Sequence, residues 1–302
     1  MTEKNTWITV VENAAKLPLV KVERNSFLRK NLCKLCTSTQ LESAIREGTL
    51  NAGIPVGVLD SAAAAVIRNE ALKVTTISAA AGIPGGIAMA ATIPVDLVQF
   101  YGFILRTAQE LAYLYGWKEL FAEGTELDAA TESQLILFIG VMSGVSAARS
   151  AITKLFGEAA KRAVAKKIAA KALTKTWYFP IAKKIAALFG NKLVKSTFAN
   201  GVAKTVPLLG GAISGGITFA AFQPMANRLK KHLSTLARMT PEEYETAVMQ
   251  GEAMLGAMEE GKEVWICQCG RESIGRFCSY CGSPKPAEEK ASSTEATESC
   301  SE

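Results

Sequence analysis

The chain has 302 residues, which is long enough for one large domain or for two domains of ordinary size. It is 49% hydrophobic with a mean hydropathy of +0.16, and its formal net charge is +6. It contains a single histidine, His232, which excludes metal sites that need several histidines. A histidine-based triad would have to use His232, and its basic neighbours disfavour this. Because His232 lies among Arg228, Lys230 and Lys231, we expect it on the surface of a basic helix.

The N-terminal residues do not have the pattern of an export signal. Residues 1–5 are polar, and the first apolar stretch contains Glu12, Lys16 and Pro18. We therefore expect the chain in a reducing cytoplasm, where thiols stay available for metal ions. The C-x-x-C sequence at 33–36 lies in a helical pattern without the strand context of a redox motif, so we interpret it as two helix cysteines.

Residues 1–240 are rich in Ala and Gly and follow helical periodicity almost throughout, which predicts a mostly α fold. The clearest helix is predicted over 95–117, where Gly116 stands as a C′ glycine would. One face of this helix is apolar and carries Leu97, Phe100, Ile104, Ala108, Leu111 and Tyr115. The opposite face is polar and carries Asp96, Gln99, Arg106, Gln109, Glu110 and Tyr113.

If the chain has a ligand pocket, this predicted helix supplies its candidate polar groups. The candidates are Asp96, Gln99, Arg106 and Gln109. Asp96 is either a charge that favours the start of the helix or a buried acid. The sequence leaves both interpretations open.

Three long stretches carry no charged residue, namely 74–95, 133–148 and 205–227. The first and third are long enough to cross a bilayer, which needs about 20 apolar residues. The breakers in these two stretches are Gly82, Pro84, Gly85, Gly86, Pro94, Pro207, Gly210, Gly211, Gly215, Gly216 and Pro224. We therefore expect each of the two to form short helices around a Gly/Pro break, as in a buried hairpin or a re-entrant segment.

Each of the three stretches also holds a Gly-x-x-x-Gly sequence, which predicts that two helix backbones approach closely along a flat stripe. The pairs are Gly82/Gly86, Gly140/Gly144 and Gly211/Gly215. Such packing suits a water-soluble core and also suits contact with lipid. The sequence leaves these two alternatives open.

Residues 154–204 contain twelve Lys or Arg residues and one acidic residue, Glu158, so this stretch has a net charge of +11. A basic, Ala-rich helical region with interleaved aromatic residues suits an anionic membrane surface. We predict that the membrane-contacting residues include Lys167, Lys171 and Lys175, which share one helical stripe, together with Trp177 and Tyr178. A solvated lysine face and a surface for nucleic-acid phosphates are the alternatives.

The chain changes character after residue 240. Residues 241–264 are predicted to form a connecting helix with Thr240 as its N-cap. Residues 265–283 are predicted to form a small ribbon. Residues 284–302 form an acidic Ser/Thr/Glu/Ala tail without an apolar pattern, which we predict to be disordered.

Four cysteines of the predicted ribbon have the spacing of a metal site. They read Cys267-Gln268-Cys269 and Cys278-Ser279-Tyr280-Cys281, and a glycine follows each pair, which lets the backbone turn at a positive φ. Two such knuckles that face each other give a tetrahedral set of four thiolates, which suits a structural Zn²⁺. The first pair is one residue shorter than the usual C-x-x-C. Two disulfides or free thiols are the alternatives.

Four short motifs follow one another within about residues 15–235. They are RNSFLRK at 24–30, AAGIPGG at 80–86, TIPVDLVQFY at 92–101 and QELAYLYGW at 109–117. Together they resemble the bacterial EcsC protein family. The resemblance implies a mostly helical domain and no established activity. Residues 265–286 resemble the short zinc ribbons that are appended to many bacterial proteins.

These patterns favour a non-enzymatic protein at the cytoplasmic face of a membrane, peripheral or partly inserted, whose ribbon binds a protein partner. The first alternative is a binder or enzyme for an apolar small molecule, with a pocket lined by the 95–117 helix. The second is nucleic-acid binding through the ribbon and the Lys-rich helices. We favour it least, because the ribbon and its flank have few basic residues, Arg271, Arg276 and Lys285, and the tail is acidic.

Overall fold

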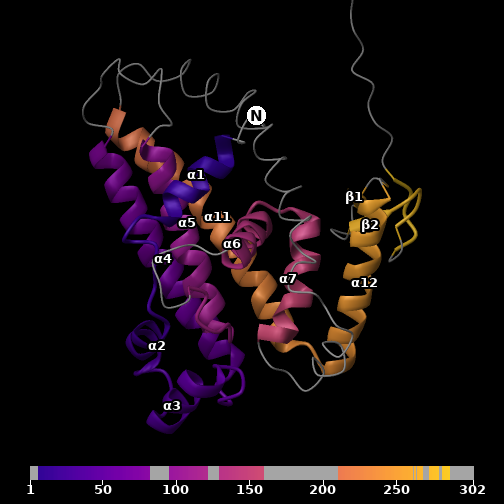
Figure 1. Cartoon of the computed structure of the whole chain (residues 1–302), viewed down its shortest axis with the longest axis horizontal. Coiled ribbons are helices and arrows are strands. Elements are labelled where there is room, and N and C mark those ends of the chain that lie inside the picture. Colours follow the sequence, from indigo (N-terminus) through magenta and orange to yellow (C-terminus); the bar gives the residue numbers. More distant parts are fainter. Residues whose placement is uncertain are drawn as a thin grey trace, which may run out of the picture. The chain divides into compact units, whose positions relative to one another are not determined.

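The computed structural model describes residues 6–81, 95–121, 129–159, 210–260, 262, 264–267, 272–278 and 281–285. Within these ranges the chain forms nine helices and one two-stranded sheet, which confirms the predicted mostly α fold. The helices are α1 (Thr6–Ala15), α2 (Arg24–Leu32), α3 (Ser38–Glu47), α4 (Val56–Ala81), α5 (Val95–Leu114), α6 (Ala129–Met142), α7 (Ser146–Ala159), α11 (Gly210–Arg238) and α12 (Pro241–Glu259) (Figure 1). The strands are β1 (Val264–Ile266) and β2 (Glu272–Ile274).

The chain divides into two compact units, residues 1–252 and 253–302. The division falls inside α12, which occupies most of the predicted connecting helix. Its N-terminus has the expected cap: the Glu243 N–H donates to Oγ1 of Thr240 at 3.3 Å, and a Glu243 carboxylate oxygen accepts from the Thr240 N–H at 2.8 Å. The predicted tail lies almost wholly outside the described residues.

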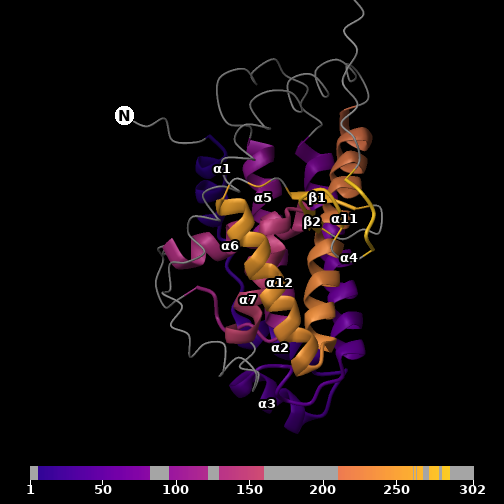
Figure 2. The ribbon, with the colours of Figure 1, turned by 90° about the vertical axis from the view of Figure 1, so that its right-hand side faces the viewer.

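Three long helices, α4, α5 and α11, form the centre of the first unit. Helix α11 packs along α4, and both contact α5, as two views at right angles show (Figure 1 and Figure 2). Helix α1 packs on α5, and the paired helices α6 and α7 pack on α11. The side chains between these helices are apolar and almost fully buried, for example Leu59, Ile67, Ile104, Phe222 and Leu229. This burial is the main source of stability in the unit.

Helix α5 is buried on its polar face as well as on its apolar face. Nε2 of Gln109 donates to the Val20 carbonyl at 2.9 Å, and the Gln109 side-chain oxygen accepts from the Val22 N–H at 3.4 Å. Glu110 and Tyr113 on the same face are also buried. The predicted amphipathic pattern therefore does not mark a surface helix, because the segment before α2 covers Gln109, α4 covers Glu110 and α2 covers Tyr113.

The end of α5 is fixed by Gly116, which has a φ of 96°. Its N–H donates to the Tyr113 carbonyl at 3.2 Å, and the Trp117 N–H donates to the Ala112 carbonyl at 3.0 Å. These two bonds form a Schellman motif with Gly116 at C′, as the sequence predicted. A residue with a Cβ is strained at this φ, whereas glycine is not.

The prediction of a helical Gly-x-x-x-Gly stripe at Gly140 and Gly144 is wrong. Helix α6 ends at Met142, and Gly144 has a φ of 83°, so the second glycine has left the helix. The Val145 N–H donates to the Gly140 carbonyl at 2.8 Å, which is again the Schellman pattern. Gly82/Gly86 lies outside the described residues, and the close approach predicted for Gly211/Gly215 stays a prediction.

The expected break of the third apolar stretch at Gly215-Gly216 and Pro224 is also wrong. Helix α11 runs without interruption from Gly210 to Arg238. A proline in a helix interior costs about 3 kcal/mol, so the helix needs support from its surroundings. Packing of α11 against four other helices, α4 to α7, supplies this support. Pro207 and residues 82–94 of the first stretch lie outside the described residues.

In the part of the chain that the structure describes, no helix combines the length and the apolar character that a membrane span requires. Residues 77–81 and 95 belong to helices, but their side chains are not described. Contact of the three apolar stretches with lipid therefore remains a prediction from their sequence pattern.

Cys33 and Cys36 lie in the turn that follows α2, not inside a helix as predicted. Helix α2 ends at Leu32, and the Cys36 N–H donates to the Leu32 carbonyl at 3.2 Å. The helix ends here because Thr37 begins the next one: its hydroxyl accepts from the Gln40 N–H at 3.2 Å, and a capping box closes.

Arg24, the first residue of α2, joins three chain segments through its buried guanidinium group. Nε donates to the Trp117 carbonyl, and Nη2 and Nη1 donate to the carbonyls of Ala44 and Ile45, each at 2.9 Å. The latter two carbonyls stand in the last turn of α3, where the helix dipole favours a cation. The first residue of the RNSFLRK motif therefore has a structural role.

His232 is not the surface residue that its basic neighbours suggest. It lies on the face of α11 that meets α7, where Nε2 is 3.3 Å from Oγ1 of Thr153 and 3.2 Å from the carbonyl oxygen of Arg149. The side chain is half-buried between α11 and α7. Burial, followed by the charge of Arg149, lowers the pKa of His232 to about 4. The imidazole is therefore neutral in the folded chain at neutral pH.

We expect acid to destabilise the first unit through His232. An unfolded histidine has a pKa of about 6.5, so the unfolded chain takes up a proton that folded His232 takes up only near pH 4. Stability is therefore lost as pH falls from about 6.5 towards 4. From about pH 7 to about pH 5 the loss from this group is about 2 kcal/mol. Urea unfolding at the two pH values measures it.

His232→Gln is the matched variant, because glutamine can form hydrogen bonds but does not titrate in this range. Its free energy of unfolding should fall by about 2 kcal/mol less than that of the wild type between the same two pH values. Equal losses in both proteins would contradict the burial of a neutral imidazole.

Candidate metal centre

The ribbon is built on a short antiparallel hairpin. Residues Val264–Ile266 of β1 pair with Glu272–Ile274 of β2 in the register that sets Trp265 opposite Ser273. Nε1 of Trp265 donates to the Gly275 carbonyl at 2.7 Å, so the indole closes over the end of the hairpin. Among the ribbon residues that the structure describes, Trp265, Cys267 and Cys278 form a buried cluster. So small a core is insufficient for independent stability, and units of this size need disulfides or metal ions.

The second cysteine pair lies on a tight turn that aims both thiols to the same side. The Cys278 N–H donates to the Ser283 carbonyl at 2.7 Å, and the Gly282 N–H donates to the Cys278 carbonyl at 2.9 Å. Gly282 has a φ of 73°, as expected for the glycine after the pair. Gly270, which follows the first pair, lies outside the described residues.

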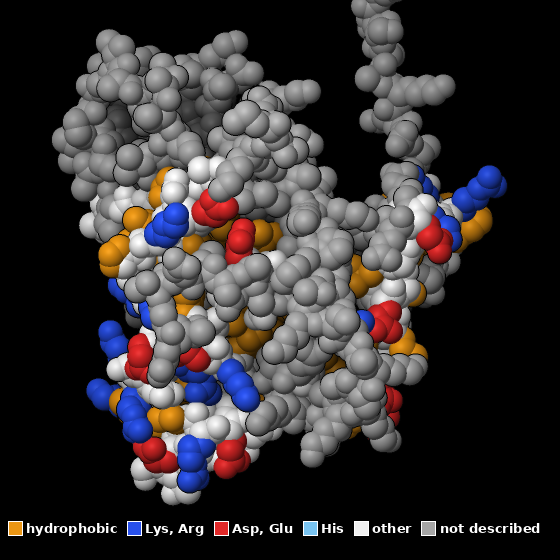
Figure 3. Space-filling model, viewed as in Figure 1, with side chains coloured by type: hydrophobic (Ala, Val, Ile, Leu, Met, Phe, Trp, Pro, Cys, Tyr) orange, Lys and Arg blue, Asp and Glu red, His pale blue; other side chains and the backbone are white. Residues whose placement is uncertain are grey.

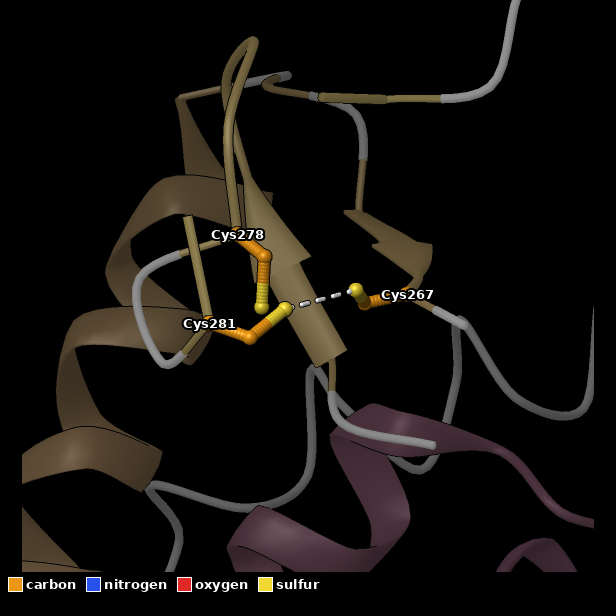
Figure 4. A group of neighbouring side chains, drawn as sticks. All are labelled: Cys267, Cys278 and Cys281. Atoms are coloured by element: carbon orange, nitrogen blue, oxygen red, sulfur yellow. Dashed lines mark hydrogen bonds between the residues drawn. The ribbon is translucent and has the colours of Figure 1, made fainter. Parts of the chain in front are cut away.

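Three cysteine sulfurs meet at one point of the ribbon. Cys267 leaves the end of β1, whereas Cys278 and Cys281 come from the turn after β2, and their side chains point towards one another (Figure 4). The sulfurs of Cys267 and Cys281 are 3.4 Å apart, and all three lie within 4.8 Å of one another. Cys267 and Cys278 are buried, whereas Cys281 is exposed.

This geometry fits a metal ion better than a disulfide. None of the five cysteines that the structure describes forms a disulfide, and the 3.4 Å between the sulfurs of Cys267 and Cys281 is well beyond a disulfide S–S length of about 2.05 Å. Four thiolates placed tetrahedrally at about 2.3 Å from one ion are separated by about 3.8 Å, which is close to the separations observed. The three cysteines could therefore hold a metal ion.

The surroundings of Cys281 favour its thiolate form, which is the form that binds metals. Its sulfur lies 3.2 Å from Oγ of Ser283. Hydrogen bonds from the side chain and then the backbone of Ser283 lower the pKa of Cys281, and a contact with Cys267 acts in the same direction.

Several predicted site residues lie outside the described residues. They are Cys269 of the metal set and the membrane-contact residues Lys167, Lys171, Lys175, Trp177 and Tyr178. The backbone of Asp96 belongs to α5, but its side chain is not described.

The structure describes three of the four side chains of the predicted ligand pocket, those of Gln99, Arg106 and Gln109. Gln109 is buried and bonded to the backbone at Val20 and Val22, so its role is structural. Gln99 is half-buried on α5. Arg106 lines a cavity together with Glu110 and with Glu70 of α4.

Sequence reasoning missed the pair Glu70 and Glu110, which are buried side by side next to Arg106. The available signal was the spacing of Arg106 and Glu110, which are four residues apart on one helix. A second signal was the place of Glu70 on the face of α4 that also carries Val66, Ile67 and Val74. A buried acid cannot be told from an exposed one by spacing alone.

No family model matches the chain, and neither the curated proteins nor the solved structures contain a match. The resemblance to the EcsC family therefore rests on the four sequence motifs.

Proposed function

We propose that residues 265–283 are a zinc ribbon that holds one structural Zn²⁺ through Cys267, Cys269, Cys278 and Cys281. The observation that carries the proposal is the convergence of three thiol sulfurs within 4.8 Å, two of them in the small buried cluster of the described ribbon residues. Sulfur ligands in a tetrahedral set suit zinc, and the reducing compartment expected for the chain keeps them as thiols. Cys269 is the nearest remaining cysteine in the sequence and completes the set.

We further propose that the chain is a non-enzymatic EcsC-like protein of the cytoplasmic membrane surface. Its ribbon binds a protein partner, and its basic region contacts anionic lipid. The supporting observation is the charge of residues 154–204, where twelve basic residues stand against one acidic residue. Each basic residue near an anionic bilayer contributes about 1 kcal/mol of attraction.

Replacing Lys167, Lys171 and Lys175 together with glutamine is expected to weaken binding to anionic vesicles by on the order of a hundredfold, because three charges of about 1 kcal/mol each are lost. Wild-type binding should also weaken as salt rises, since the attraction is screened beyond about 8–10 Å at physiological ionic strength. Cosedimentation with phosphatidylserine-containing vesicles measures both effects.

The matched control removes three exposed lysines of the first unit, Lys16, Lys30 and Lys34, and so changes the net charge equally. This control should bind anionic vesicles about as well as the wild type. Equal loss in both triple variants would show that only net charge matters. Equal binding of the wild type to anionic and to neutral phosphatidylcholine vesicles would overturn the proposed membrane contact.

A further inference from the structure

A cavity of about 530 Å³ lies between α2, α4, α5 and the segment that precedes α2. This volume is in the range of small-molecule sites in proteins. The apolar part of its lining comes from Val22, Phe27, Val66 and Leu72. The rest is polar or charged and consists of Lys21, Glu23, Ser26, Lys30, Asn31, Asn69, Glu70, Lys73, Arg106 and Glu110. The cavity therefore does not suit a wholly apolar molecule.

Two buried carboxylates, Glu70 of α4 and Glu110 of α5, line this cavity, and each residue is only 3% exposed. Nε of Arg106 lies 3.1 Å from Oε1 of Glu110 and 3.6 Å from Oε1 of Glu70. Nζ of Lys73 is 2.5 Å from the same Glu70 oxygen. Both cations therefore engage the Oε1 atoms of the pair.

The other oxygen of each carboxylate is unsatisfied. Oε2 of Glu70 and Oε2 of Glu110 are buried and have no hydrogen-bonding partner among the residues that the structure describes. Buried polar atoms without partners are rare, because they lose their hydration without compensation. Burial, and then the charge of Glu70, raise the pKa of Glu110, while Arg106 and Lys73 oppose the shift. Such perturbed acids in cavities are typical of binding sites.

Glu23, the third acidic residue of the lining, is already occupied. Its two oxygens accept hydrogen bonds from the N–H groups of Asn25 and Ser26, at 2.9 and 2.6 Å, and cap α2. Glu70 and Glu110 are therefore the two acidic residues of the lining that keep a carboxylate oxygen without a hydrogen bond. Two carboxylates are too few for Mg²⁺ or Ca²⁺, which take six or more oxygen ligands. The positive charge of Arg106 beside them also repels a metal cation. An anion at this point would be repelled by Glu70.

We propose that this cavity binds a small zwitterion whose protonated amine donates its N–H groups to Oε2 of Glu70 and Oε2 of Glu110. An ammonium group offers three donors, which is enough to serve both oxygens. Lys21 and Lys30 line the same cavity, so an anionic group at the other end of the ligand gains a second contact. The surface over α2 and α3 shows basic and acidic side chains intermixed (Figure 3), and this suits a ligand that carries both charges.

Isothermal titration calorimetry with the full-length chain tests the proposal through three probes that share one carbon skeleton. They are 4-aminobutyrate with both charges, butylamine with the amine alone, and butyrate with the carboxylate alone. At millimolar concentrations 4-aminobutyrate should bind best, butylamine more weakly, and butyrate not measurably. Butyrate binding as tightly as 4-aminobutyrate, or no binding of either amine, would overturn the proposal.

Glu70→Gln and Glu110→Gln should each weaken 4-aminobutyrate binding by about tenfold or more, because a hydrogen bond to a charged partner is lost. Glu42→Gln is the matched control, since it removes an exposed carboxylate of α3 that does not line the cavity. Asn69→Trp fills the cavity from an exposed position and leaves both carboxylates in place. Asn69→Trp should abolish 4-aminobutyrate binding without loss of stability. This variant tests ligand binding in the cavity even if the glutamine variants do not fold. Unchanged binding in the cavity variants would place the ligand elsewhere and contradict the inference.

Discussion

Replacing Cys278 with serine is expected to abolish zinc binding and to unfold residues 265–283, while the helical unit of residues 1–252 stays folded. Cys278 supplies one of the three converging sulfurs and belongs to the buried cluster with Trp265 and Cys267. Metal binding provides most of the folding free energy of so small a unit, about 10–16 kcal/mol in zinc-finger peptides. Metal analysis of the purified protein should show that the zinc content falls from one ion per chain in the wild type to none in the variant.

Cys33→Ser is the matched control for this variant. Cys33 is a free, exposed cysteine in the turn after α2, so its replacement should leave both the zinc content and the thermal unfolding of the chain unchanged. Far-UV circular dichroism should show the same helical content in both variants. A zinc content that survives Cys278→Ser would exclude Cys278 from the metal set.

Replacing Arg24 with alanine is expected to destabilise the helical unit by about 3–5 kcal/mol. The guanidinium is buried and donates to three carbonyl oxygens, those of Ala44, Ile45 and Trp117, at 2.9 Å each. All three acceptors would lose this donor in a site with little access to water. Arg24→Lys should recover only part of the loss, because one ammonium cannot reproduce the planar fork of donors.

Arg29→Ala on the same helix provides the comparison, and urea unfolding provides the measurement. Arg29 forms an exposed ion pair with Glu42, and exposed pairs contribute about 0–1 kcal/mol. The free energy of unfolding should therefore change little in this variant. Similar losses of unfolding free energy in Arg24→Ala and Arg29→Ala would contradict the proposed role of the buried guanidinium, which is to link α2, α3 and the end of α5 by hydrogen bonds.

Local signals in the sequence were sufficient where neighbours in the chain decide the structure. Gly116 ends α5 and Thr240 caps α12 because these roles depend on backbone angles and on hydrogen bonds within a few residues. The same is true of Gly282 in the cysteine turn. The spacing of the cysteines likewise predicted that Cys267, Cys278 and Cys281 converge, and their sulfurs lie close together in the structure.

The sequence failed where distant segments decide the structure. Gly215-Gly216 and Pro224 predict a break, but α11 stays helical because four other helices pack on it. His232 stands among basic residues in the sequence, yet α7 covers its ring. The pairing of Glu70 with Glu110 joins two helices, so no local pattern reports it. Burial by tertiary contacts overrides local preference in each of these cases.

The most direct test of the metal centre is zinc K-edge X-ray absorption of the full-length chain, purified without chelators. We predict one zinc per chain with four sulfur ligands at about 2.3 Å, supplied by Cys267, Cys269, Cys278 and Cys281. A chain without zinc, or a first shell in which nitrogen or oxygen replaces two or more of the sulfurs, would contradict it.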